Sequence, residues 1–223
     1  MPRNALRFAS IAAALSALTT FLLWLLPRLY TSPASFEQVI ALHANPVYLG
    51  RLWVNFIHIF FALTAYAAAA YVLWRRTPAL AGLGFVWMLM WGMAELLGVS
   101  VNLFAVNATW RAQFAASTPA VQEHLRVLLM GFQGVWDAVF FLLLVCFLLG
   151  SLCYGLALAG QRGMERALGW LFLLAVPLTV AIMLGGYTSI NHFDAFTGAV
   201  YPILQPASRL LLAAWLWRQA TKA

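Results

Sequence analysis

The chain has 223 residues, of which 64% are hydrophobic and only 9% are charged. Soluble domains contain roughly 45–50% apolar and about 25% charged residues, so this composition excludes a water-soluble fold and indicates a membrane protein. The formal net charge is +7, and the basic residues lie near the ends of apolar segments rather than in one patch. That distribution is typical of membrane topology signals, and we expect no nucleic-acid partner.

A membrane-spanning helix needs about 20 mainly apolar residues to cross a hydrocarbon core roughly 30 Å thick. Six segments meet this requirement and leave no room for a separate aqueous domain, so we expect a single all-α transmembrane domain over residues 1–223. The first segment is also compatible with a signal peptide, but its apolar run exceeds the roughly 7–15 residues usual there. The six predicted spans are Phe8–Leu26, Leu52–Trp74, Ala79–Val106, Gly134–Ala159, Ala167–Ile190 and Gly198–Trp217.

The basic residues predict the orientation of this polytopic helix bundle. Eight lie on the side that holds both chain ends, namely Arg3, Arg7, Arg75, Arg76, Arg162, Arg166, Arg218 and Lys222. Four lie on the other side, namely Arg28, Arg51, Arg111 and Arg126. Because cytoplasmic loops carry the excess of Lys and Arg, we expect both termini in the cytoplasm.

One exterior segment has the pattern of a short helix. Ser117 and Thr118 offer a hydroxyl cap, and Pro119 suits the first helical position. Apolar residues then follow on one face, with Gln122, Glu123 and Arg126 on another. We expect a short amphipathic exterior helix before the fourth span, lying on the outer membrane surface.

Ionisable residues inside membrane helices are costly and are candidates for function. Five predicted spans carry polar residues in the half toward the exterior, whereas their cytoplasmic halves are almost entirely apolar. The fifth span also leads into Asn191 and Asp194, and Pro202 and Pro206 predict a kinked or unwound outer half of the sixth. We predict that one outward-facing, ligand-binding cavity is surrounded by Asn55, His58, Glu95, Asn102, Asp137, Tyr187, His192, Tyr201, Gln205 and Arg209.

Glu95 and Arg209 both lie near the middle of their spans, so we predict that they come within hydrogen-bonding reach, directly or through one water. They form either a structural ion pair between two helices or a functional pair, in which Arg209 holds an anionic ligand head or Glu95 acts as an acid or base. His58 is either a hydrogen-bonding group between helices or a metal ligand. No H-x-x-x-H, H-E-x-x-H or C-x-x-C spacing occurs, so no metal site is predicted, and no cofactor is specified.

The stretches Ala44-Asn45-Pro46 and Leu49-Gly50-Arg51-Leu52 precede the second span, and the last span carries Pro206 before a Leu-rich end at Leu216. In these features the chain resembles a large family of uncharacterised bacterial six-span integral membrane proteins, known as a domain of unknown function. The resemblance implies six spans and a bacterial inner membrane, and it implies no activity.

Three functions fit the sequence. The first is binding or transport of a small polar or amphiphilic ligand in the cavity. The second is an intramembrane enzyme acting on a lipid or isoprenoid-like substrate, with Glu95 or Asp137 as acid or base, His58 assisting, and a metal possible only through side chains brought together by the fold. The third is a structural subunit of a membrane complex, because small residues such as those at 67–70 and 150–155 suit contacts within or between chains.

Overall fold

In the computed structural model, which describes residues 1–188, 190 and 192–222, the chain is helical throughout and the described residues contain no strand. Five of the helical segments described are long and apolar enough to cross a membrane. They are Arg3–Leu29, Pro46–Trp74, Pro78–Ala116, Pro119–Ala159 and Met164–Tyr187. This all-helical, apolar architecture is that of a membrane protein, as the composition predicts.

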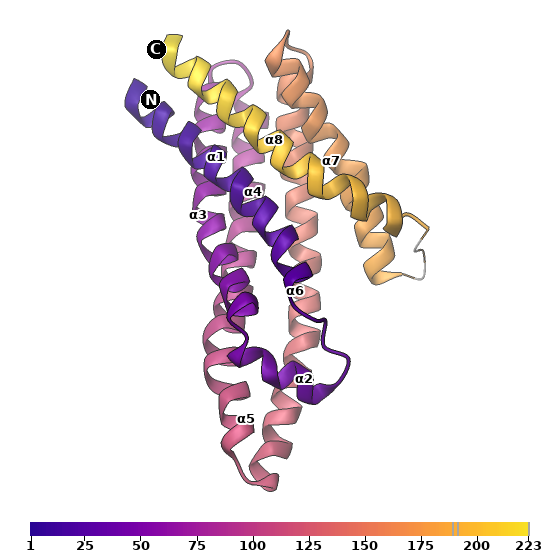
Figure 1. The fold of residues 1–223 in the computed structure, drawn as a ribbon. Helices are drawn as coiled ribbons and strands as arrows, with labels where there is room; N and C mark the ends of the chain where they lie inside the picture. The colour runs from indigo at the N-terminus through magenta and orange to yellow at the C-terminus, as the bar shows by residue number, and fades with distance from the viewer. Residues whose placement is uncertain (189, 191, 223) are drawn as a thin grey trace.

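The described residues form six long helices and several short ones (Figure 1). In chain order they are α1 (Arg3–Leu25), the 3₁₀ helix η1 (Leu26–Leu29), α2 (Phe36–Ala41), the 3₁₀ helix η2 (Leu42–Ala44), α3 (Pro46–Trp74), α4 (Pro78–Ser100), the π-helix η3 (Val101–Arg111), α5 (Ala112–Ala116), α6 (Pro119–Ala159), α7 (Met164–Tyr187) and α8 (Asp194–Lys222).

The helices begin where local chemistry favours a start. Proline occupies the first position of α3, α4 and α6, where its missing N–H is not needed. Asn45 caps α3, since its Oδ1 accepts hydrogen bonds from the amides of Val47 and Tyr48, both at 3.0 Å. Gly163 precedes α7 with a φ of 60°, which a residue with a side chain rarely adopts.

The long helices form a closed ring in which each packs against two others, in the order α1, α3, α4, α6, α7, α8 and back to α1. Both termini, the α3–α4 turn and the α6–α7 turn lie at one end, which we call the basic end (Figure 1). At the opposite, distal end lie α2, α5 and the first turns of α6. An apolar core fills the basic half and includes Tyr66, Met88, Trp91, Tyr154 and Leu212.

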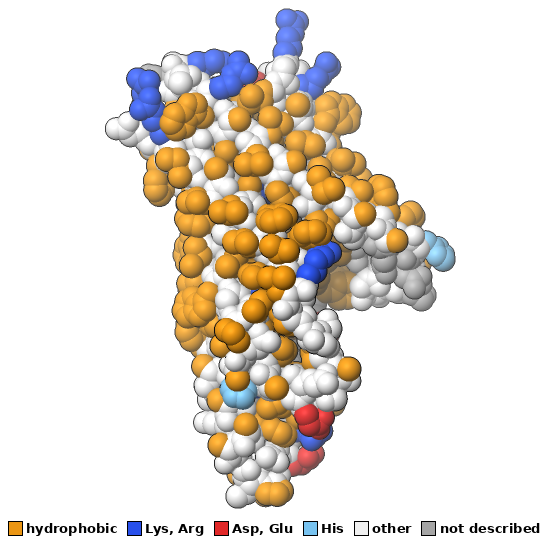
Figure 2. All heavy atoms as spheres, in the orientation of Figure 1, with side chains coloured by type: hydrophobic (Ala, Val, Ile, Leu, Met, Phe, Trp, Pro, Cys, Tyr) orange, Lys and Arg blue, Asp and Glu red, His pale blue; other side chains and the backbone are white. Residues whose placement is uncertain are grey.

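The charges are distributed very unevenly between the two ends. Eight of the 13 basic residues and one of the six acidic residues, Glu165, occupy segments at the basic end. The remaining five basic and five acidic residues balance, so the basic end accounts for the whole formal charge of +7. Figure 2 shows Lys and Arg crowding this end, a hydrophobic middle, and Asp and Glu mainly at the distal end.

The structure corrects the predicted exterior helix. Thr118 and Pro119 do start a helix, as expected, but the segment forms the first turns of the unbroken 41-residue helix α6. At 1.5 Å per residue, such a helix is about 60 Å long, roughly twice the hydrocarbon core. The distal part of α6 therefore extends past any single membrane crossing, alongside η3 and α5.

The last helix also differs from expectation. Pro202 and Pro206 lie inside α8, which stays one helix rather than unwinding in its outer half. Polar residues, among them Gln205, Ser208 and Arg209, lower its hydropathy, and α8 is not among the five helices apolar enough to count as spans.

Candidate functional site

A cavity of about 270 Å³ opens between α1, α3, α4, η3 and α6. One wall is polar and comes from consecutive turns of α3 together with α4 and η3. It consists of Tyr48, Arg51, Asn55, Glu95 and Asn102. The rest of the lining is apolar and consists of Leu23, Leu52, Val99, Trp136, Phe140 and Leu143. A cavity lined by both polar and apolar side chains suits an amphiphilic molecule.

A second cavity of about 310 Å³ adjoins the first toward the distal end and shares Tyr48, Asn102 and Trp136 with it. Phe36 and Val39 of the short helix α2 line it, so the first exterior segment forms part of its wall. Arg111 of η3 lines this second cavity as well. The two cavities thus adjoin each other, and each has an arginine in its lining.

The π-helix η3 builds the polar wall between these two cavities. Asn107 donates through Nδ2 to the carbonyl oxygen of Asn102 at 2.6 Å and to its Oδ1 at 2.7 Å, an i to i−5 contact that π-helical geometry permits. Arg111 then donates to Asn107 Oδ1 at 2.7 Å and to the hydroxyl of Tyr48 at 3.2 Å. Single π-turns recur at functional sites, and here eleven residues adopt this form.

Arg111 has an unusual electrostatic environment. Its exposed fraction is 8%, its Nε is buried without a hydrogen-bond partner, and no carboxylate pairs with it in the described part of the chain. Arg51, in the first cavity, donates to the hydroxyl of Tyr30 at 3.1 Å and has no carboxylate partner there either. The cavity wall therefore holds more positive than negative charge.

A second polar cluster lies next to this space, where α1, α3, α4 and α8 meet. Arg209 is 5% exposed, and its Nη1 donates to Ser16 Oγ and lies 3.1 Å from His58 Nε2. His58 Nδ1 lies 2.8 Å from Thr19 Oγ1. The Arg209 guanidinium also lies over the Trp91 ring, 5.9 Å from its centroid.

These contacts assign the protonation of His58. A guanidinium only donates hydrogen bonds, so His58 Nε2 accepts from Arg209 and the proton resides on Nδ1. Nδ1 then donates to Thr19 Oγ1, whose own proton is directed to a backbone carbonyl of α1. His58 is thus a neutral group that hydrogen-bonds between helices and orients Arg209.

The predicted direct ion pair between Glu95 and Arg209 is not formed. The two interact electrostatically, but Arg209 is directed toward Ser16 and His58, whereas Glu95 lines the first cavity beside Asn55. A contact through one water stays a prediction. Asn55 Oδ1 is buried and, among the residues described, has no hydrogen-bond partner, so the cavity wall retains an unused acceptor.

The structure distributes the ten predicted site residues over several places. Asn55, Glu95 and Asn102 line the first cavity, whereas His58, Gln205 and Arg209 are buried but line neither cavity. Tyr201 is half-buried on α8, and its hydroxyl interacts electrostatically with Arg209 and Glu95.

The other three residues are not in the lining of the cavities, although Asp137 accepts a hydrogen bond at 2.8 Å from Gln133, which lines the second one. Asp137 and Tyr187 are exposed, with the Tyr187 hydroxyl donating to the Asp137 carbonyl oxygen at 2.6 Å, so they join α6 to α7 at the surface. His192 is exposed in the α7–α8 turn. Asn191 and the side chain of Asp194 lie outside the described residues.

Sequence reasoning missed Tyr48, Asn107 and Arg111 as site residues. The sequence does contain Asn102 and Asn107 five residues apart. In an α-helix residues at that spacing do not share a face, because the residues that do are three or four apart. No group of three or more His, Cys, Asp and Glu side chains in the described ranges is placed to hold a metal ion. No family model, curated protein or solved structure matches the chain, so its function is argued from its own residues.

Proposed function

We propose that this protein is a six-span protein of the bacterial inner membrane that binds a small amphiphilic molecule with an anionic head in the two adjoining cavities. In this proposal α8 is the sixth span, the basic end faces the cytoplasm, and the cavities open toward the exterior. The excess of Lys and Arg at the basic end supports this orientation.

The packing of α8 supports a sixth crossing despite its polar residues. Gln205, Ser208 and Arg209 are buried against neighbouring helices, while Ile203 and Leu210 are 72% and 55% exposed. Polar residues on the inside and apolar residues on the outside are the arrangement that a lipid environment requires. Without α8 the ring of helices would also be open between α1 and α7.

Arg111 carries the argument for an anionic ligand. A buried charge without a partner is costly, and the cost falls when an opposite charge and further hydrogen bonds are supplied. Arg111 lacks both a carboxylate and a partner for Nε among the described residues. A phosphate or carboxylate between Arg111 and Arg51 would supply them, and the wall formed by Trp136, Phe140 and Leu143 would cover an apolar tail.

The proposal is one of binding rather than passage through the bundle. The polar groups of the cavities end at Arg209 and His58, and the half beyond them is filled by the apolar core. A ligand with an apolar tail could enter sideways between helices from the lipid.

The test compares three decyl probes on purified protein in phosphatidylcholine nanodiscs. They are decyl phosphate, decyltrimethylammonium and decyl maltoside, and the measurement is the shift of the thermal unfolding midpoint with probe concentration. We expect the phosphate to raise the midpoint at the lowest concentration, since ligand that binds the folded state stabilises it.

The variants decide whether the cavity is responsible. Arg111→Gln should weaken binding of decyl phosphate at least tenfold, and Arg51→Gln should weaken it less because that side chain is less buried. The matched control is Arg28→Gln, which removes an exposed arginine that lines neither cavity. If none of the probes shifts the midpoint, or if Arg111→Gln and Arg28→Gln behave alike, the proposal is wrong.

A further inference from the structure

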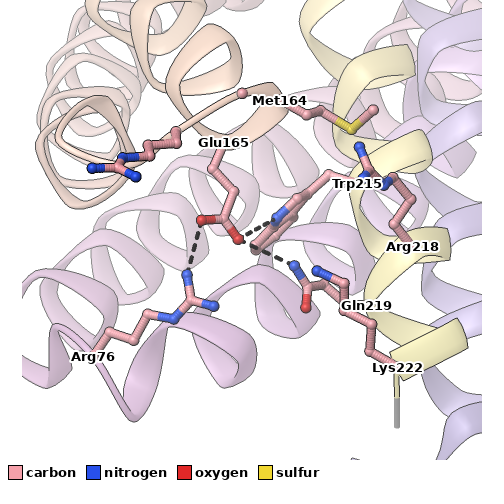
Figure 3. A pocket seen from close by; sticks show the side chains of 9 residues that line it. Arg76, Met164, Glu165, Trp215, Arg218, Gln219 and Lys222 are labelled. Carbon is pink, nitrogen blue, oxygen red and sulfur yellow. Dashed lines mark hydrogen bonds and ion pairs between the residues drawn. The ribbon is translucent and has the colours of Figure 1, made fainter.

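A separate pocket of about 230 Å³ lies at the basic end, where the α3–α4 turn, the start of α7 and the end of α8 meet (Figure 3). Its charged lining consists of Arg76, Arg162, Glu165, Arg218 and Lys222. It lies outside the cavities described above and shares no residue with them.

Glu165 uses its acceptor capacity within the protein. Its Oε2 forms an ion pair with Arg76 Nη1 at 2.8 Å, and its Oε1 accepts from Trp215 Nε1 at 3.1 Å and Gln219 Nε2 at 3.2 Å. Figure 3 shows these three donors converging on the carboxylate from two elements, Arg76 from the α3–α4 turn and Trp215 and Gln219 from α8. Glu165 therefore fixes the ends of α7 and α8 against the α3–α4 turn, with its charge compensated by Arg76.

The other three cations of the pocket are not compensated. Arg162, Arg218 and Lys222 are exposed, and no carboxylate in the described part of the chain pairs with them. Arg218 and Lys222 are four residues apart on α8 and so lie on one helix face. Three cations around a concave site are a favourable environment for a phosphate group, which accepts charge-assisted hydrogen bonds from each.

The surroundings of the pocket indicate that this phosphate comes from lipid. Three exposed tryptophans lie near this end, namely Trp74 of α3, Trp170 of α7 and Trp217 of α8, with exposed fractions of 56%, 60% and 46%. Tryptophan is enriched at the level of lipid headgroups, which places the pocket at the same level. Basic pockets at helix ends on the cytoplasmic side are a recurrent type of site for anionic headgroups.

We propose that the pocket between Arg162, Arg218 and Lys222 binds the phosphate of an anionic phospholipid in the leaflet at the basic end. The bound lipid would neutralise part of the charge excess and join the ends of α7 and α8 through a shared anion. This site is independent of the ligand proposed for the distal cavities.

The experiment is native mass spectrometry of the full chain released from detergent, with phosphatidylglycerol, phosphatidylcholine or inorganic phosphate added. We expect phosphatidylglycerol adducts to survive to higher collision energy than phosphatidylcholine adducts. The double variant Arg218→Gln with Lys222→Gln should reduce the phosphatidylglycerol adducts at least fivefold. Arg218→Lys, which keeps the charge, should retain most of them and shows that the fold is intact.

The control double variant is Arg3→Gln with Arg166→Gln, which removes two charges from the same end but none from the pocket. Adducts that fall equally in both double variants would mean that lipid responds to the overall charge, and the proposed site would be wrong. Binding of inorganic phosphate without a preference for phosphatidylglycerol would assign the pocket to a free anion and overturn the lipid assignment.

Discussion

The basic half and the distal half of the bundle both contain charged side chains, but they treat them differently. At the basic end Glu165 receives donors from Arg76, Trp215 and Gln219, and the helices beside it are packed by a continuous apolar core. In the distal half Arg111 has no carboxylate partner among the described residues, and it lines the second of the two cavities. A polar cluster that satisfies itself stabilises the fold, whereas one with unused hydrogen-bonding capacity is suited to a ligand.

The largest effect is expected at the boundary between the halves. Arg209→Gln or Glu95→Gln alone leaves the other charge inside the bundle without the opposite charge with which it interacts. Loss of one partner of a directly bonded buried pair costs about 3–5 kcal/mol, which is an upper bound for these two residues because they form no direct ion pair. The double variant should be more stable than either single variant. Chemical unfolding in detergent measures the free energy of unfolding of the two single variants and the double variant. If the losses in the single variants add up to the loss in the double variant, the two charges do not interact.

The next effect concerns the close packing of the basic half. A Cβ at Gly169 would lie 2.4 Å from the backbone nitrogen of Ala159 and 2.7 Å from the carbonyl carbon of Leu158. Gly169→Ala should therefore push α6 from α7 and destabilise the protein by about 1–3 kcal/mol.

Gly134→Ala in the distal part of α6 is the control, because nothing lies within 4 Å of its added Cβ. It should leave the stability unchanged or raise it slightly, since alanine favours a helix. Both are measured as thermal unfolding midpoints. If both variants lowered the unfolding midpoint equally, the basic half would not be more closely packed than the distal half.

A smaller effect is expected from the π-helix. Asn107→Ala removes hydrogen bonds to Asn102 and Arg111, and a typical hydrogen bond contributes about 0.5–1.5 kcal/mol. Binding of decyl phosphate should weaken less than in Arg111→Gln, because the charge remains. Thr109→Val, which removes one exposed hydrogen bond from the same helix, is the control. If Asn107→Ala weakened binding more than Arg111→Gln, the charge would not be the main determinant.

The smallest effect is expected at the basic end. Arg76 is 46% exposed in its ion pair with Glu165, and exposed pairs contribute only about 0–1 kcal/mol. In Glu165→Gln the amide oxygen of the new side chain can still accept the hydrogen bonds from Trp215 and Gln219. The unfolding midpoint should therefore move little. A loss comparable to that of Gly169→Ala would show that the Glu165 cluster, rather than helix packing, stabilises this half.

Hydropathy predicted the course of the long helices, and the capping rules predicted the helix start at Pro119, because that choice depends on the nearest few residues. The start of α3 was predicted less well, since the helix begins at Pro46, after its cap Asn45, and not at Leu52. The length of α6 could not be read in the same way, since the polar residues before Gly134 interrupt the apolar pattern without interrupting the helix. The separate exterior helix was wrong for this reason.

The direction of side chains was harder to predict than their depth. Asp137 and His58 were assigned to one cavity because of their similar depth, yet Asp137 lies at the surface and His58 faces α1 and α8. His58 contacts Thr19 directly, and Arg209 links it to Ser16. Ser16 and Thr19 are two small polar residues within an apolar run. Which helix neighbours which cannot be deduced from one sequence, so this cluster could not be foreseen.

The ring has a consequence for biosynthesis, because its closing contact joins the first and last long helices. Ser16 of α1 accepts a hydrogen bond from Arg209 of α8, across a separation of 193 residues. Chains emerge from the ribosome N-terminus first, so α1 and α3 are made long before α8. Until Arg209 is synthesised, Ser16 and His58 have no guanidinium to contact. The ring therefore stays open between α1 and α7 until α8 is made, and in a chain truncated before α8 these polar groups would lack the helix that covers them.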